Sequence, residues 1–204
     1  MNSSPRAMAV HLFASVLCLA ISGCTLLSPR VPQTTLRPTL SESGLHWPAG
    51  LRLGRVTSVA SLQDTRILVA DGALRMQHPE LRWLDPPPVM LEEELRLLQA
   101  QSVSGSGSIA ARVSIDLWLA SQELRVSPSG RLQVAVTATA RLRCERTGDA
   151  TDLFAAHGES SVDDAPRAVA AGFSQALSDV LTKLLSEVSE LDARCGIDPT
   201  SPTH

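Results

Sequence analysis

The sequence predicts an α/β (α+β) fold, a two-layer sandwich in which a mixed or antiparallel sheet packs one face against two amphipathic helices. Segments of alternating polarity, clearest at 113–144, are typical of strands with one buried face. Two later stretches, after residues 88 and 166, repeat apolar residues every three or four positions, as amphipathic helices do. The 204 residues are enough for one such domain.

Short extended segments precede the first helix. The alternation shifts at Gly54, which predicts a bulge in the first strand. Asp71-Gly72 is a favourable two-residue turn between the second and third segments, and it predicts a hairpin. The predicted segments are 51–59, 66–70, 73–77 and 80–84.

The first helix is predicted to begin in the run from Asp85 to Pro88, because proline is tolerated in a first helical turn. Its apolar stripe consists of Leu91, Leu95 and Leu98. Three glutamates, 92–94, lie early in this helix, where negative charge suits the helix dipole. We interpret them as a solvated acidic face rather than a catalytic or metal site. A loop is predicted at 102–108.

Three antiparallel strands are predicted next. The first covers 113–126 and changes parity near Ser121, which indicates a second bulge. A turn at 127–130 leads to a return strand at 132–144, whose alternation points Cys144 inward. The third strand is predicted at 152–160.

The last element is a long amphipathic helix. Asp163 or Asp164 can cap it, Pro166 lies in its first turn, and Gly196 can close it. Its apolar residues recur at spacings of three and four: Val169, Phe173, Leu177, Val180, Leu184, Val188 and Leu191.

The N-terminus has the features of an export signal. Arg6 precedes an almost wholly apolar run that is too short to span a bilayer. The run ends in Ile21-Ser22-Gly23-Cys24, which resembles the lipobox of bacterial lipoproteins. The resemblance implies cleavage after Gly23 and an N-acyl diacylglycerol group on Cys24, with no other cofactor. The alternatives are an ordinary secretory signal with a stray cysteine, or a short membrane anchor.

The predicted organisation has four parts. They are the signal peptide at 1–23, the lipidated cysteine with a flexible tether at 24–46, the folded domain at 47–196 and a disordered tail at 197–204. Thr25 follows the lipidated cysteine, and a residue other than Asp there is associated with the outer membrane in sorted lipoproteins. We therefore expect the protein at the inner leaflet of the outer membrane, facing the periplasm.

Cys144 and Cys195 are the cysteines outside the leader and the lipobox. An exported protein reaches a compartment where disulfides persist, so the two can pair. They can equally remain separate thiols, because the sequence does not show how close they lie. No histidine or cysteine lies at metal-ligand spacing near either one, so we expect no metal site.

Composition and motifs exclude several functions. The formal charge is −3 and the chain has no tyrosine, which argues against a nucleic-acid partner. The histidines are scattered and no nucleophile motif is present, so we expect no enzyme activity.

The segment at 81–98, LRWLDPPPVMLEEELRLL, resembles the ABC-type transport auxiliary lipoproteins, with Trp83 and Pro88 matching best. The strand pair beginning VSIDLWLAS and the helix beginning DDAPRAVAAGF follow the order of that family. The resemblance covers about 45–190, and the family includes paraquat-inducible protein C. It implies a non-catalytic docking subunit that binds an MCE-domain protein of a phospholipid transport system. The alternative is a structural lipoprotein that stabilises an outer-membrane protein complex.

Two tryptophans are candidate partner contacts, since tryptophan is enriched at interface hot spots. Trp118 lies opposite the aliphatic face of its strand, and Trp83 lies in the segment that carries the resemblance. The alternative for Trp118 is that the N-terminal segment covers this face. A homo-oligomer is also compatible with the sequence.

Overall fold

The structure is a computed structural model that describes residues 32–40, 44–105, 112–145, 147–148 and 150–196. From Gln33 on, the described residues belong to one compact unit. Its elements in chain order are β1 (Thr34–Leu36), β2 (Leu51–Ser58), η1 (Ala60–Leu62), β3 (Arg66–Asp71), β4 (Leu74–Trp83), α2 (Pro87–Gly105), β5 (Val113–Val126), β6 (Leu132–Cys144), β7 (Ala150–Val162) and α3 (Pro166–Gly196).

The seven strands form one mixed sheet in the order β1-β4-β3-β5-β6-β7, with β2 also paired to β5. Strand β5 is central. One edge pairs antiparallel with β6 along its whole length. The other edge pairs parallel with β2 in its first half and with β3 in its second half. The predicted mixed sheet with two helices is confirmed.

Both predicted bulges are present. The register of β2 against β5 shifts between Leu53 and Val56, and the register of β5 against β6 shifts between Leu119 and Ser121. A Cβ atom on Gly54 would collide with the carboxylate of Asp116, so this bulge requires glycine. The predicted turn at Asp71-Gly72 is also present, and Gly72 has a positive φ of 54°.

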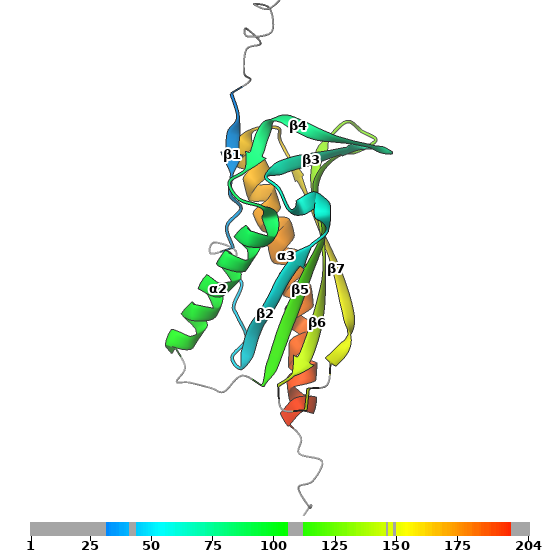
Figure 1. The fold of residues 1–204 in the computed structure, drawn as a ribbon. Helices are drawn as coiled ribbons and strands as arrows, with labels where there is room; N and C mark the ends of the chain where they lie inside the picture. Colours follow the sequence, from blue (N-terminus) through cyan, green and yellow to red (C-terminus); the bar gives the residue numbers. More distant parts are fainter. Residues whose placement is uncertain (1–31, 41–43, 106–111, 146, 149, 197–204) are drawn as a thin grey trace, which may run out of the picture. The chain divides into compact units, whose positions relative to one another are not determined.

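The two helices pack on the sheet face that carries the aliphatic side chains (Figure 1). Helix α3 packs against β6 and β7, and α2 lies beside β2. The predicted stripe of α2 and the predicted apolar residues of α3 up to Val188 are buried. Leu191 belongs to α3, but its side chain is outside the described part.

The lengths of several elements differ from prediction. The segments predicted separately at 73–77 and 80–84 form one strand, β4. Helix α2 continues to Gly105, into the stretch predicted as a loop. Strand β7 begins at Ala150 and ends at Val162, two residues beyond the prediction at each end.

The tether predicted at 24–46 is too long, and the domain predicted at 47–196 begins too late. Residues 34–36 form β1, which pairs parallel with the end of β4. Leu36 and Leu40 are buried in the core. Prolines and hydroxyl residues surround these leucines, so no local period marks them. Their partners are distant in the sequence, and only the folded chain shows the contact.

The acidic-face interpretation of 92–94 is wrong for one residue. Glu94 is buried, and its Oε2 accepts a hydrogen bond from the backbone N–H of Leu40 at 3.0 Å. Its Oε1 lies 3.6 Å from Nη2 of Arg37, which also bonds Glu93 at 2.9 Å. These carboxylates therefore hold the N-terminal segment against α2.

We predict that Glu94→Ala lowers the free energy of unfolding by about 1–3 kcal/mol, because it removes the buried carboxylate that accepts the hydrogen bond of the Leu40 N–H. The matched control is Glu92→Ala, which removes only an exposed pair with Arg96 and should cost about 0.5 kcal/mol or less. Urea denaturation measures both. Equal costs for the two variants would contradict the assignment.

Candidate interaction face

The sheet face opposite the helices carries the candidate site. We call it the Trp118 face, and its centre lies on β2, β5 and β6. It consists of Arg52, Arg55, Thr57, Asp116, Trp118, Thr139, Arg141 and Arg143.

Trp118 lies at the middle of this face. It pairs in register with Thr57 on β2 and with Thr139 on β6. Its neighbours Leu117 and Leu119 point into the core, as the alternation of a strand requires. Trp118 remains 46% exposed, so the described N-terminal segment, which pairs with β4, does not cover it. The predicted outward placement is confirmed.

Asp116 organises the polar groups one step along β5. Its Oδ1 accepts a hydrogen bond from the backbone N–H of Arg55 at 2.8 Å, at the bulge that Gly54 allows. Its Oδ2 lies 3.9 Å from Nη2 of Arg143. In the register of the sheet, Arg141 is directly opposite Asp116.

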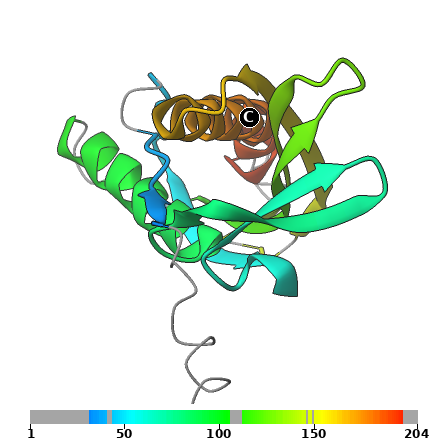
Figure 2. The same cartoon turned by 90° about the horizontal axis from the view of Figure 1, so that it is seen from above.

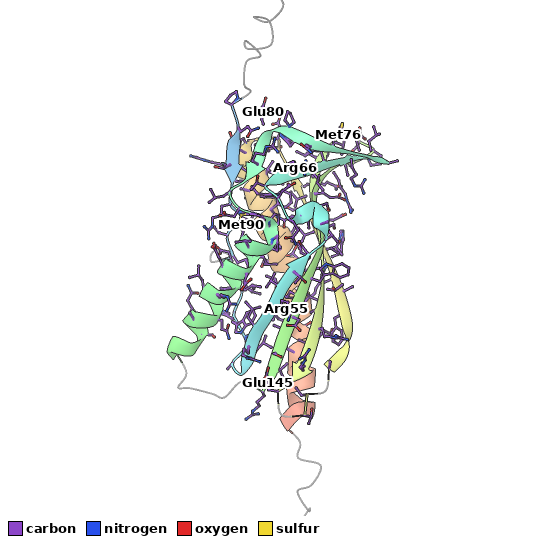
Figure 3. All side chains as sticks on the ribbon, in the orientation of Figure 1. Arg55, Arg66, Met76, Glu80, Met90 and Glu145 are labelled. Atoms are coloured by element: carbon purple, nitrogen blue, oxygen red, sulfur yellow. The ribbon has the colours of Figure 1, made fainter. Side chains whose placement is uncertain are left out.

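A second carboxylate borders the face at its lower end in Figure 3, where Glu145 is labelled. The guanidinium of Arg52 hydrogen-bonds this carboxylate. That bond holds the pKa of Glu145 below its usual range, and a hydrogen bond from Ser114 lowers the pKa further. Glu145 is therefore ionised at neutral pH and neutralises Arg52.

Arginine exceeds carboxylate on this surface. The guanidinium groups of Arg55 and Arg141 are exposed and form no hydrogen bond or ion pair within the described residues. Four arginines therefore face the two carboxylates of Asp116 and Glu145. The surplus of positive charge beside an exposed tryptophan suits an acidic partner surface.

Two arginines elsewhere on the same sheet face, Arg75 and Arg125, are paired. The buried carboxylate of Glu123 bonds Arg75 at 3.1 Å and Arg125 at 2.9 Å. Arg125 also lies 3.2 Å from Glu159. The pKa of Glu159 lies below its usual range, first because His157 hydrogen-bonds it and then because of the charge of Arg125. Arg55 and Arg141 differ from Arg75 and Arg125 because no carboxylate pairs with them within the described residues.

Trp83 is not a partner contact, contrary to the prediction. It is 1% exposed and packs edge-to-face on Phe173 of α3, with ring centroids 4.6 Å apart. Its Nε1 is buried and has no hydrogen-bond partner in the described part of the chain. Trp83 therefore joins β4 to α3 in the core. Of the two candidate tryptophans, only Trp118 is exposed to a partner.

The remaining predicted site residues have different outcomes. Cys144 is buried and disulfide-bonded, and it points inward as predicted. The side chain of Cys195 lies outside the described residues, so its pairing with Cys144 stays a prediction. Gly23 and Cys24 also lie outside the described part.

Sequence reasoning found Trp118 but named no arginine of the Trp118 face as a candidate contact, and Arg55 is the hardest of them to place. The alternation of β6 already placed Thr139, Arg141 and Arg143 on the polar side of that strand. Arg55 follows the glycine at the bulge, where the alternation breaks. Its place opposite Asp116 becomes visible only in the register of β2 against β5. The bulge predicted at Gly54 was the one available signal.

A cavity of about 860 Å³ opens on the helix side, between β6, β7 and the start of α3. Its lining mixes the apolar Leu132 and Val162 with the charged Arg131, Asp163 and Asp164. Such a mixed, open lining is unlike the apolar pockets that bury small molecules.

Two further features of the described residues bear on function. No group of three or more histidine, cysteine, aspartate or glutamate side chains is placed to hold a metal ion there. In that same part of the chain, no helix combines the length and the apolar character needed to cross a membrane.

Comparison with known proteins identifies the fold. A protein of Xanthomonas campestris assigned to the DUF330 family has a TM-score of 0.60 and 17% identity, over 82% of this chain and 93% of that one. A second, uncharacterized protein has a TM-score of 0.51 and 12% identity, over 78% and 97% of the two chains. At these identities the likeness establishes a shared fold.

Other comparisons are weaker. A Caulobacter crescentus protein proposed to be a lipoprotein has a TM-score of 0.36 and 14% identity, over 48% of this chain and 80% of that one, which is too little to establish a shared fold. No protein-family model and no curated protein matches the sequence.

We predict a large loss of stability when Trp83 is replaced and a small change when Trp118 is replaced. Trp83→Ala should lower the free energy of unfolding by about 3–5 kcal/mol, because it opens a cavity beside Phe173. Trp118→Ala should change it by less than about 1 kcal/mol, because the side chain points outward. Urea denaturation of both variants gives the comparison. A large loss for Trp118→Ala would mean that this residue supports the fold rather than a partner.

Proposed function

We propose that the chain is a non-catalytic docking subunit of an MCE-ABC-type phospholipid transport system, anchored by acyl chains on Cys24 to the periplasmic side of the outer membrane. Three observations support this proposal: the lipobox, the resemblance of 45–190 to the transport auxiliary lipoproteins, and a fold shared with a DUF330 protein. The main support for a docking role is the exposed Trp118 beside unpaired arginines, because this arrangement suits protein binding.

The chemistry of the Trp118 face suggests how binding would occur. Tryptophan and arginine are the residue types that most often dominate the energy of interfaces. A rigid, twisted sheet presents them without ordering a loop, so association costs little conformational entropy. The surplus of arginine would speed the approach of an acidic surface on the MCE-domain protein, and salt would weaken that effect.

We predict that Trp118→Ala weakens binding to the MCE-domain protein of the same organism by about 30-fold, which corresponds to a hot-spot loss of about 2 kcal/mol. Arg141→Glu should slow association and largely remove its salt dependence, because it leaves three arginines facing three carboxylates and so cancels the surplus of positive charge. Surface plasmon resonance at two salt concentrations measures both effects.

The matched control for docking is Leu97→Ala. It removes another exposed apolar side chain, 55% exposed and on α2. Unchanged binding by Trp118→Ala, or an equal loss with Leu97→Ala, would refute docking through this face. A photo-crosslinker at Trp118 that captures an outer-membrane barrel protein instead would favour the structural alternative.

The anchor itself has a direct test. Cys24→Ser should shift the protein from the membrane fraction to the soluble periplasmic fraction, because the acyl chains are lost and each buried methylene contributes about 0.8 kcal/mol. Cys18→Ser is the matched control, since it changes a cysteine of the leader and should leave fractionation unchanged. Membrane association that survives Cys24→Ser would refute lipidation at this position.

A further inference from the structure

The β3–β4 hairpin carries apolar side chains that the helices do not cover. On the helix side of the sheet, two rows of residues run in register from β4 across to β7. The first row is Leu74, Asp71, Val126, Leu132 and Val162, and the second is Met76, Val69, Leu124, Val134 and Ser160.

Helix α3 covers one end of these two rows and leaves the other end exposed. Helix α3 lies so close over β6 and β7 that a Cβ on Gly172 would collide with Val162 and approach Val134. At the other end, the hairpin extends sideways beyond α3 (Figure 2). Leu74 and Met76 there remain 63% and 52% exposed. They extend the helix side of the sheet onto a surface that the described residues leave open, where the exposed Asp71 lies opposite Leu74.

The hairpin lies at the end of the domain where the anchored segment enters. Strand β1 begins at Thr34 and pairs with Leu81 of β4. Its start and the hairpin lie at the same end of the sheet in Figure 1, and Met76 and Glu80 are labelled at this end in Figure 3. The chain from Cys24 to Thr34 spans at most about 35 Å even when fully extended. A lipidated Cys24 would thus keep this end near the bilayer.

The arginines Arg66 and Arg75 near the hairpin are neutralised, whereas the exposed carboxylates of Asp71 and Glu80 have no ion pair within the described residues. Arg75 pairs with the buried Glu123, and Arg66 pairs with Asp64. The Arg66 hydrogen bond holds the pKa of Asp64 below its usual range, so the pair is ionised at neutral pH. Two exposed apolar side chains with no surplus of positive charge around them suit contact with a bilayer through burial of apolar surface, and such contact does not require anionic headgroups.

We propose that Leu74 and Met76 enter the interfacial region of the same bilayer that holds the acyl chains of Cys24. This inference rests on the lipid anchor of the proposed function. Two side chains bind a membrane weakly by themselves, but the anchor raises their effective concentration at the surface. The contact orients the domain, and it leaves the Trp118 face free for a partner.

The test uses the lipidated full-length protein in vesicles of phosphatidylethanolamine and phosphatidylglycerol. A single cysteine at position 76 (Met76→Cys) carries an environment-sensitive NBD fluorophore, since Cys144 is disulfide-bonded. Leu97→Cys is the matched control, because Leu97 is 55% exposed but lies on α2. The emission of the probe at 76 should shift to shorter wavelength in vesicles and be quenched by spin-labelled lipid, while the probe at 97 should show neither change.

The outcomes separate this inference from the proposed function. If the protein floats with the vesicles but the two probes behave alike, the membrane contact of the hairpin is wrong and the anchor stands. If the protein does not float, the anchor fails and the contact fails with it. A shift at 76 that depends on protein density, without quenching by spin-labelled lipid, would assign the hairpin to a second copy of the chain and overturn the membrane contact.

Discussion

The structure depends on the pairing of β5 along both of its edges. Its inward side chains, from Val113 to Leu119, form the centre of the core, and its outward side chains include Asp116 and Trp118. The bulge between Leu119 and Ser121 bends the strand, so that its two halves meet different partners, β2 and β3. The Trp118 face and the projecting hairpin both follow from this division.

The periodicity of the sequence predicted the elements whose conformation depends on residues close together in the chain. The strand pair 113–144, the bulges and the two helices follow from alternation, turn residues and proline positions. Contacts between distant segments were not predictable in this way. Strand β1 pairs with β4, which lies far from it in the sequence, and the buried carboxylate of Glu94 accepts a hydrogen bond from the distant Leu40.

The two tryptophans illustrate the same limit at the candidate site. Trp118 lies in a long alternating strand, so its parity could be assigned from the sequence and is confirmed. Trp83 ends a strand that contains Pro79 and whose first residues are exposed on both sides, so parity could not place it. Its contact with Phe173 depends on how α3 crosses β4, which the sequence does not encode locally.

A lipid anchor and a docking face together require a means of orientation. An acyl anchor alone would fix one point of the domain and would not set its orientation, so a partner would meet the Trp118 face only part of the time. A second contact near the entry of β1 would restrict that rotation. Trp118 lies on the half of β5 that pairs with β2, and the hairpin pairs with the other half, so contact of the hairpin with a membrane would not cover Trp118. Orientation by the hairpin would thus raise the affinity of docking without adding any contact to the interface.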